Sequence, residues 1–320
     1  MIQKILVPLD GSALAESALP QAVAVAKALA AEIVVLRIQE TDGRRHGELV
    51  DSVVWRMGRA EDTAYVKGIA ARLCGQGVRA AAVLAEGDPA EEILKQVRQQ
   101  AVDLVVLSSH GRSGPQTFSL GSTTQKVLSQ AGTSVLVVRE EPPGEAPAEV
   151  RFLRVMVPLD GSQQAQWALL QAVPLVRAGG GELLLVHVVT CPALARRTPP
   201  AQEEAELARQ LVEHDRRLAE RYLGEMQELL AGSGVRTRSL LFESPHVVQT
   251  LDKAAADEQV SLMVISAHGC SGAAPWPYGS VADRLIHHGT TPLLVLQDLT
   301  ARLPPETTDV QGRAPALTAV

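Results

Sequence analysis

The sequence contains few cysteines, few aromatic residues and no excess of basic charge. Its three cysteines are far apart and form no CxxC pair, so they indicate neither a disulfide framework nor a zinc site. Aromatic residues make up 3% of the chain and leave few side chains on which bases could stack. The formal net charge is −6 at pH 7, whereas nucleic-acid binding usually leaves a basic footprint. We therefore expect no nucleic-acid partner.

A long uninterrupted apolar run is also missing. The longest apolar region, residues 13–38, is interrupted by Glu16, Pro20, Gln21, Lys27 and Glu32. These interruptions exclude a membrane-spanning helix by the usual length rule. The first apolar segment has no secretory leader before it. We therefore expect a protein of the reducing cytoplasm that has no membrane partner.

The chain does contain an internal repeat, and its 320 residues accommodate two domains of ordinary size. The sequence VPLDGS occurs at 7–12 and again at 157–162, which is 150 positions later. At two glycine-rich loops farther along each copy, the offset is 158. We divide the chain into domain 1 (1–139), an extended linker rich in proline and acidic residues (140–151), domain 2 (152–298) and a tail predicted to be disordered (299–320).

Each repeat alternates short, β-rich apolar runs with longer amphipathic segments, which is typical of βαβ units and a parallel sheet. Continuous runs such as DLVVLS and SVLVV suit strands that helices cover on both faces. The pattern therefore predicts an α/β fold in which each domain is a five-stranded, doubly wound sandwich. Strands are expected near 3–8, 32–38, 78–85, 103–109 and 134–139, and near 153–158, 182–189, 235–242, 261–266 and 292–297. Helices are expected near 13–30, 55–75, 89–101 and 121–131, and near 163–178, 201–231, 246–257 and 280–288.

Two segments of each repeat are expected to meet at the carboxyl ends of the strands, where ligands bind in open α/β sheets. The first is the end of the first strand, which carries Asp10 and, in the second copy, Asp160. The second is a glycine-rich loop, SSHGRSGPQTFSLGS at 108–122 and SAHGCSGAAPWPYGS at 266–280. Each loop ends in Gly-Ser where the next helix begins, so free N–H groups there would favour an anion such as phosphate. By themselves, these loops are equally compatible with simple turns.

The segment KILVPLDGS, the β/α alternation and the G-x9-G-S loop together resemble the universal stress protein family, and the duplication resembles its tandem two-domain form. The resemblance implies two tandem Rossmann-like (adenine nucleotide alpha hydrolase-like) domains that bind ATP, with or without Mg²⁺. In nucleotide-binding members the loop reads G-x2-G-x9-G-[ST], and its backbone holds the phosphates and the ribose. Carried onto this sequence, the implied binding residues are Asp10, Ile38, Ser108, Gly111, Arg112, Gly121 and Ser122 in domain 1, and Asp160, Val188, Ser266, Gly269, Gly279 and Ser280 in domain 2.

Both repeats depart from this family pattern at its first glycine, which is Ser108 in domain 1 and Ser266 in domain 2. The added hydroxyl either hydrogen-bonds a ribose or crowds it. The second loop departs further, because Cys270 replaces Arg112 and the loop gains two prolines and a tryptophan. We therefore expect poorer nucleotide binding in domain 2, or a domain that is retained for pairing alone.

The sequence favours regulation over catalysis. His110 and His268 precede loop glycines, but no nucleophile and carboxylate motif accompanies them, and GRSG is not a GxSxG elbow. The expected function is an ATP-responsive switch in the stress response, and the chain is not expected to be an enzyme. Two alternatives remain open, namely a nucleotide-free adaptor and an adenylyl-transferring enzyme.

The resemblance also implies that the two domains pair through their last strands, at 134–139 and 292–297, so that neither edge is exposed. A homodimer and an unidentified protein partner remain open as well. The helix expected at 201–231 carries apolar residues close to helical spacing, which we interpret mostly as a stripe that faces the core.

Overall fold

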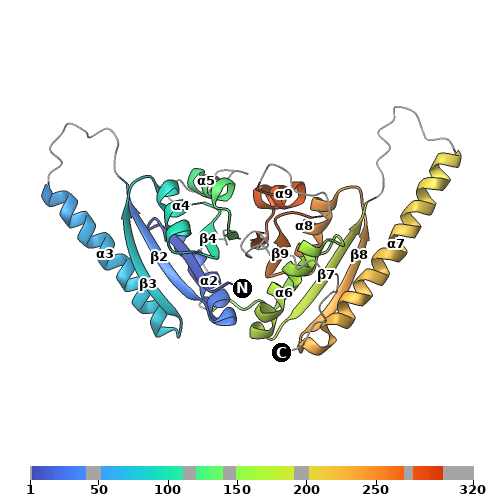
Figure 1. The fold of residues 1–320 in the computed structure, drawn as a ribbon, viewed down its shortest axis with the longest axis horizontal. Helices are drawn as coiled ribbons and strands as arrows, with labels where there is room; N and C mark the ends of the chain where they lie inside the picture. Colours follow the sequence, from blue (N-terminus) through green and yellow to red (C-terminus); the bar gives the residue numbers. More distant parts are fainter. Residues whose placement is uncertain are drawn as a thin grey trace, which may run out of the picture.

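Two α/β domains follow one another along the chain and pack side by side (Figure 1). The computed structural model describes residues 2–40, 52–110, 120–139, 149–190, 202–269 and 277–297. The predicted tail at 299–320 and most of the predicted linker at 140–151 lie outside these residues.

Strands and helices alternate through both domains, and each predicted strand is confirmed to within a residue at either end. Domain 1 consists of β1 (Lys4–Leu9), α1 (Ala13–Glu16), α2 (Ala18–Leu29), β2 (Glu32–Gln39), α3 (Ser52–Gly75), β3 (Arg79–Glu86), α4 (Pro89–Gln99), β4 (Leu104–Ser108), α5 (Ser122–Gln130) and β5 (Ser134–Val138). Domain 2 consists of β6 (Arg154–Pro158), α6 (Gln163–Gly179), β7 (Glu182–Val189), α7 (Gln202–Leu230), a 3₁₀ turn (Ala231–Ser233), β8 (Arg236–Glu243), α8 (Val247–Asp257), β9 (Leu262–Ser266), α9 (Ser280–His288) and β10 (Leu293–Leu296).

The helix predicted at 13–30 is wrong in one respect, because it is two helices, α1 and α2, that meet at Ser17. Pro20 lies in the first turn of α2, where a missing N–H group costs no hydrogen bond. A single continuous helix would place Pro20 in its interior, where the ring clashes with the carbonyl group of residue 16. The Ser17 hydroxyl donates to the carbonyl oxygen of Leu14 at 2.7 Å, at the end of the first helix.

The strands of the described residues form one ten-stranded sheet in the order β3-β2-β1-β4-β5-β10-β9-β6-β7-β8. Pairing is parallel within each domain and antiparallel where β5 meets β10. At that junction Leu136 faces Leu294, which lies 158 positions later and is therefore its counterpart in the second copy. The predicted pairing of the last strands is confirmed, and it relates the two domains by an approximate two-fold axis (Figure 1).

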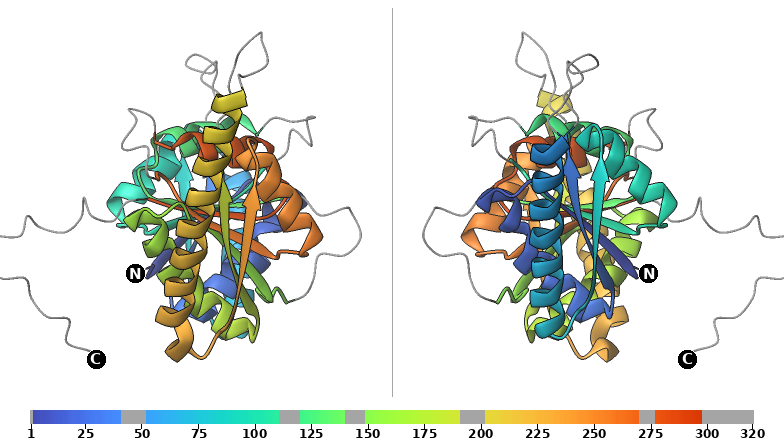
Figure 2. Two further views of the ribbon diagram at one scale, coloured as in Figure 1. Left: turned by 90° about the vertical axis from the view of Figure 1, so that its right-hand side faces the viewer. Right: turned by 90° about the vertical axis from the view of Figure 1, so that its left-hand side faces the viewer.

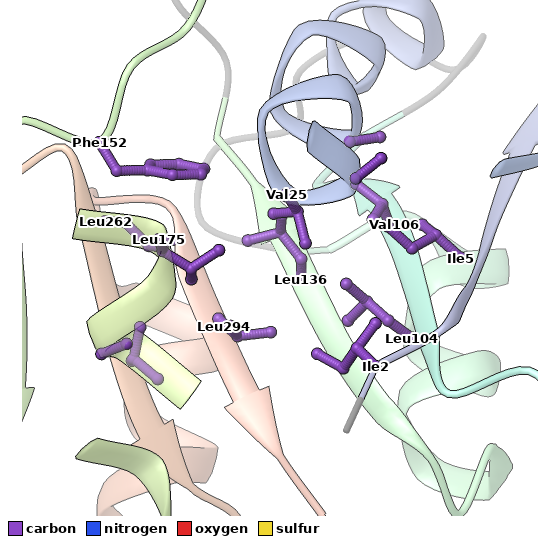
Figure 3. Close-up of a cluster of buried hydrophobic side chains, with 14 of the residues drawn as sticks. Ile2, Ile5, Val25, Leu104, Val106, Leu136, Phe152, Leu175, Leu262 and Leu294 are labelled. Atoms are coloured by element: carbon purple, nitrogen blue, oxygen red, sulfur yellow. The ribbon is translucent and has the colours of Figure 1, made fainter. Parts of the chain in front are cut away.

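Helices cover both faces of the sheet, and buried apolar side chains fill the space between. On one face α2, α3, α6 and α7 pack on the strands, and on the other face α4, α5, α8 and α9 do so (Figure 2). Both buried clusters run across the junction between the domains. In Figure 3, Val25 and Leu136 of domain 1 belong to the same cluster as Leu175 and Leu294 of domain 2. Among the described helices, none combines the length and the apolar character needed to cross a membrane.

Candidate functional site

Each domain has a cavity at the carboxyl ends of its strands. The strand order reverses between β1 and β4 in domain 1 and between β6 and β9 in domain 2, and ligands bind at such reversals. The domain 1 cavity has a volume of about 410 Å³ and the domain 2 cavity about 650 Å³. Both volumes lie within the range of small-molecule sites.

The structure brings the predicted site residues that it describes to these two cavities. Gly111 and Arg112 lie outside the described residues. Contact of the lining residues with a ligand stays a prediction. The domain 1 cavity is lined in part by Asp10, Ile38, Ser108, Gly121 and Ser122, and the domain 2 cavity by Asp160, Val188, Ser266, Gly269, Gly279 and Ser280.

The repeated Asp-Gly-Ser sequence forms a turn that starts the first helix of each domain. Asp10 Oδ1 accepts hydrogen bonds from the backbone N–H of Ser12 at 2.8 Å and from its hydroxyl at 2.6 Å. The hydroxyl oxygen of Ser12 accepts from the N–H of Ala15 at 3.1 Å and so caps α1. Gly11 has φ 81°, a conformation that glycine adopts without strain. The turn therefore fixes the carboxylate at the cavity, and the second copy repeats it with Asp160, Gly161, Ser162 and Ala165.

The helices that follow the glycine-rich loops begin without a capping side chain. Gly121 and Gly279 occupy the N-cap positions of α5 and α9, and neither cap makes a side-chain hydrogen bond. By contrast, Ser12 caps α1, Asp88 caps α4 and Ser162 caps α6. Among the described residues, the first N–H groups of α5 and α9 therefore border the cavities without a capping side chain, and the helix dipole adds partial positive charge there. Such a helix end suits an anion.

Two cationic side chains line the domain 1 cavity. Lys126, in the second turn of α5, has its Nζ 3.9 Å from Asp88 Oδ2. Arg37 lies on β2, and its Nε donates to Asp62 Oδ1 of α3 at 2.8 Å. Its Nη1 also donates to the carbonyl oxygen of Leu9 at 3.4 Å. Arg37 was not among the predicted site residues, although a polar residue inside an apolar strand was a usable signal.

The two serines that replace the first loop glycine use their hydroxyl groups within the loop. The Ser108 hydroxyl donates to the carbonyl oxygen of His110, and the Ser266 hydroxyl donates to that of His268 at 2.7 Å. Both serines are buried. The structure therefore adds a third possibility to the two that the sequence left open, in which the hydroxyl closes a local turn. The same bond in both domains indicates that the exchange stabilises the loop.

The three described glycines of these loops differ in what surrounds them. A Cβ on Gly269 would overlap the carboxylate of Asp160, so a larger residue there would require that side chain to move. At Gly121 a Cβ would lie 3.7 Å from the carbonyl oxygen of Ser109, and at Gly279 it would lie 3.5 Å from that of Ala267. These are ordinary contacts, so packing of the protein itself does not require glycine at the two helix starts.

The loop histidines and the acidic side chains are the remaining groups that could take part in chemistry or bind a metal ion. His110 lines the domain 1 cavity, and its Nδ1 lies 3.2 Å from the hydroxyl oxygen of Ser109. The loop-positioning role expected for His110 and His268 stays a prediction. Within the part of the chain that the structure describes, no group of three or more His, Cys, Asp or Glu side chains is arranged to hold a metal ion.

Comparison with known proteins accounts for both copies. The family model described as "Universal stress protein family" matches residues 1–139 and again residues 151–297. The sequence is similar to universal stress protein YxiE of Bacillus subtilis, with 30% identity over 148 residues that cover 43% of this chain and 100% of that protein. It is also similar to universal stress protein Rv2005c of Mycobacterium tuberculosis, with 30% identity over 204 residues that cover 60% of this chain and 61% of that protein.

The fold also has a counterpart among solved structures. A crystal structure of a universal stress protein from Archaeoglobus fulgidus matches with a TM-score of 0.63 and 20% identity. The match covers 92% of this chain and 98% of that chain. At this identity the likeness concerns the fold alone, and it extends over both domains.

Proposed function

The chain belongs to the universal stress protein family, in its tandem two-domain form, and we propose that it binds ATP in the domain 1 cavity and acts as a nucleotide-responsive regulator. One observation carries the proposal. An uncapped helix N-terminus, a lysine side chain and a carboxylate converge on a single cavity at the point where the strand order reverses. These are the groups that a phosphorylated nucleoside needs at its two ends.

The phosphate end of the proposed site is the start of α5. The amide groups of its first turn and the Lys126 ammonium offer hydrogen bonds and positive charge to an anion. Gly121 supports this assignment, because the protein leaves room for a Cβ there and no packing requirement explains the glycine. A side chain at this position would occupy space that the phosphates need.

The nucleoside end of the proposed site is formed by the ends of β1 and β2. Asp10 is fixed by Ser12 and offers a carboxylate that can accept hydrogen bonds from ribose hydroxyl groups. The ladder between β1 and β2 ends at the pair Leu9 and Arg37. Ile38 follows that last pair, so its backbone extends past the end of β1 and is available to the edge of an adenine ring.

Regulation, in this proposal, comes from occupancy and does not require turnover. ATP would contact the ends of three strands and the start of α5, and a ligand that binds one arrangement of these elements better shifts the population toward it. The resulting change in the surface around the cavity would be read by a partner in the stress response. We propose no catalytic residue.

Calorimetric titration of ATP, with and without Mg²⁺, into the wild type, Asp10→Ala and Gly121→Val tests this proposal. The wild type is expected to bind, and each substitution is expected to weaken binding by about tenfold or more, because an acceptor is lost or the phosphate space is filled. The matched substitution Gly279→Val in domain 2 is expected to leave ATP binding in domain 1 unchanged. Thermal unfolding of each variant separates a lost ligand from a lost fold.

Two other results would replace the proposal. If the wild type gives no heat and heat-denatured protein releases no adenine nucleotide in mass spectrometry, the chain is a nucleotide-free adaptor. If ATP is converted rapidly to AMP or phosphate in the presence of an acceptor, the chain is an enzyme and the regulatory reading is wrong.

A further inference from the structure

The two cavities differ in size, and the repeats differ in the side chains that join a strand end to the neighbouring helix. Arg37 in β2 corresponds to His187 in β7, 150 positions later. Arg37 reaches from the carbonyl oxygen of Leu9 to the carboxylate of Asp62 on α3 and fills the space between strand end and helix. The Nδ1 of His187 lies 2.7 Å from the carbonyl oxygen of Leu159, which corresponds to Leu9. The position that corresponds to Asp62, 157 residues later, is Ala219, so domain 2 has no carboxylate there.

The smaller side chains of His187 and Ala219 leave the domain 2 cavity open toward α7. No residue of α3 is among the described residues that line the domain 1 cavity. In domain 2, α7 forms an additional part of the cavity wall with Asp215, Leu218, Ala219 and Tyr222. The cavity there measures about 650 Å³, against about 410 Å³ in domain 1.

The charges around the two cavities differ as well. Among the described residues, no lysine or arginine lines the domain 2 cavity, which has Asp160 and Asp215 in its wall. The wall of the domain 1 cavity also contains carboxylates, those of Asp10, Glu40 and Asp88, but it includes the cations Arg37 and Lys126. The counterpart of Lys126 is Arg284, which is exposed and is not part of the described cavity wall. Asp215 is half-buried at the cavity and makes no hydrogen bond or ion pair with another described residue.

The start of α9 is also more apolar than the start of α5. Val281 and Ala282 stand in the domain 2 cavity wall where Thr123 and Thr124 stand in domain 1. Val247 and Leu251 of α8 add further apolar surface to the same wall. Within the described part of domain 2, a carboxylate without a partner, apolar walls and the lack of a lining lysine or arginine all disfavour several negative charges close together.

We propose that the domain 2 cavity binds an adenine nucleoside that carries no polyphosphate chain, while the domain 1 cavity retains the preference for the triphosphate. This inference rests on the proposed function of the cavities as adenine sites. The retained turn at Asp160 and the uncapped start of α9 keep the elements that hold a nucleoside. The Asp215 carboxylate adds negative charge, and the described wall offers no lysine or arginine to compensate the charge of a triphosphate.

Equilibrium dialysis with radiolabelled adenosine and ATP tests the assignment of one ligand to each cavity. The double variant Asp10→Ala/Gly121→Val lacks the ribose acceptor and the phosphate space of domain 1, and it is expected to bind one equivalent of adenosine and to bind ATP at least about tenfold more weakly than adenosine. The matched variant Asp160→Ala/Gly279→Val carries the same changes in domain 2 and is expected to keep ATP binding and lose that adenosine site. Equal affinity of Asp10→Ala/Gly121→Val for ATP and adenosine would overturn the inference while the proposed function stands. If the wild type binds neither probe, the proposed function itself falls.

Two substitutions in domain 2 then test whether charge or cavity volume sets the preference for adenosine over ATP. In the Asp10→Ala/Gly121→Val background, Asp215→Asn removes the carboxylate charge and leaves the volume, and the ratio of ATP to adenosine affinity is expected to rise about three- to tenfold. His187→Arg adds a cation that can pair with Asp215 and is expected to raise the same ratio. Asp257→Asn, on the exposed last turn of α8, removes a charge away from the cavity and should leave the ratio unchanged. A ratio that neither cavity substitution moves would show that charge does not set the preference.

Discussion

Arg139, the residue after β5, makes a partly buried contact between the domains. Its Nη2 donates to the carbonyl oxygens of Leu285 at 2.8 Å and Ile286 at 2.7 Å, near the end of α9. The C-terminal end of a helix carries partial negative charge, so a cation there is favourable. Burial lowers the pKa of Arg139 to about 10, although Asp252 opposes the shift, and the guanidinium therefore stays charged at neutral pH.

We expect Arg139→Ala to lower the free energy of unfolding by about 1.5–3 kcal/mol, because two carbonyl groups lose a charged donor. Urea denaturation of the full chain measures this change. The control is Arg151→Ala, whose partner Glu149 lies 3.1 Å away in an exposed pair. That substitution should cost less than about 1 kcal/mol. Equal effects of the two substitutions would contradict the structural role given to Arg139.

Asp252, on α8, predicts a dependence of stability on pH. Burial raises the pKa of its carboxyl group, and this effect exceeds the opposing effects of the Thr290 backbone and the charges of Arg139 and His288. A raised pKa means that folding disfavours the charged form, so stability from this group is lost as pH rises through the shifted pKa. Asp252→Asn should therefore gain stability relative to the wild type at pH 7, and the gain should vanish below the ordinary pKa of 3.8. Parallel stability curves for the two proteins, measured by urea denaturation from pH 3 to 8, would rule this out.

At the scale of elements, the strands and most helices could be predicted because apolar runs, amphipathic segments and turn residues recur in two copies. The break between α1 and α2 at Ser17 could not be predicted, since it depends on which helical turn contains Pro20. The positions of Asp10 and Gly121 at a cavity could be predicted because both residues belong to sequence patterns that occur in each repeat. The contact of Arg37 with Asp62 was missed because it joins residues from a strand and a helix whose packing the sequence does not state.

The long helices α3 and α7 each carry an interior glycine that packing does not explain. Nothing lies within 4 Å of a Cβ built on Gly68 or on Gly224. We expect Gly68→Ala and Gly224→Ala each to raise the free energy of unfolding by about 0.5–1 kcal/mol, because alanine loses less backbone entropy in a helix. Gly179→Ala, in the last turn of α6, is the contrasting variant, because its Cβ would lie 2.7 Å from the carbonyl oxygen of Phe152. Urea denaturation should show the first two stabilised and the third destabilised, and any other order would be against this explanation.

At the scale of the whole molecule, the sheet and both buried clusters are continuous across the domain junction. Leu136 and Leu294 are fully buried where β5 and β10 pair (Figure 3). A protein with two independent cores could open one domain at a time. This continuity predicts that the two domains unfold as one cooperative unit.

We expect Leu294→Ala to lower the free energy of unfolding by about 2–5 kcal/mol, because it leaves a cavity at the junction. Hydrogen exchange followed by mass spectrometry should then show faster exchange in β4 of domain 1 as well as in β9 of domain 2. Leu229→Ala, at a site 64% exposed on α7, is expected to change neither strand. Faster exchange confined to domain 2 would mean that the domains open separately.

The pairing of Leu136 with Leu294 joins the two domains as the subunits of a symmetric dimer would be joined, but here each half has its own sequence within one chain. In a dimer of identical chains, every inherited substitution appears twice, so a change that suits one half is imposed on the other. Here the counterpart of Arg139 is Gln297, which contacts Pro277 through its side chain at 3.3 Å. One half can therefore keep a partly buried arginine that contacts the other half, while the corresponding position of the other half holds a neutral residue. Because the two copies belong to one chain, each half can change without the same change in the other, and the two cavities can specialise.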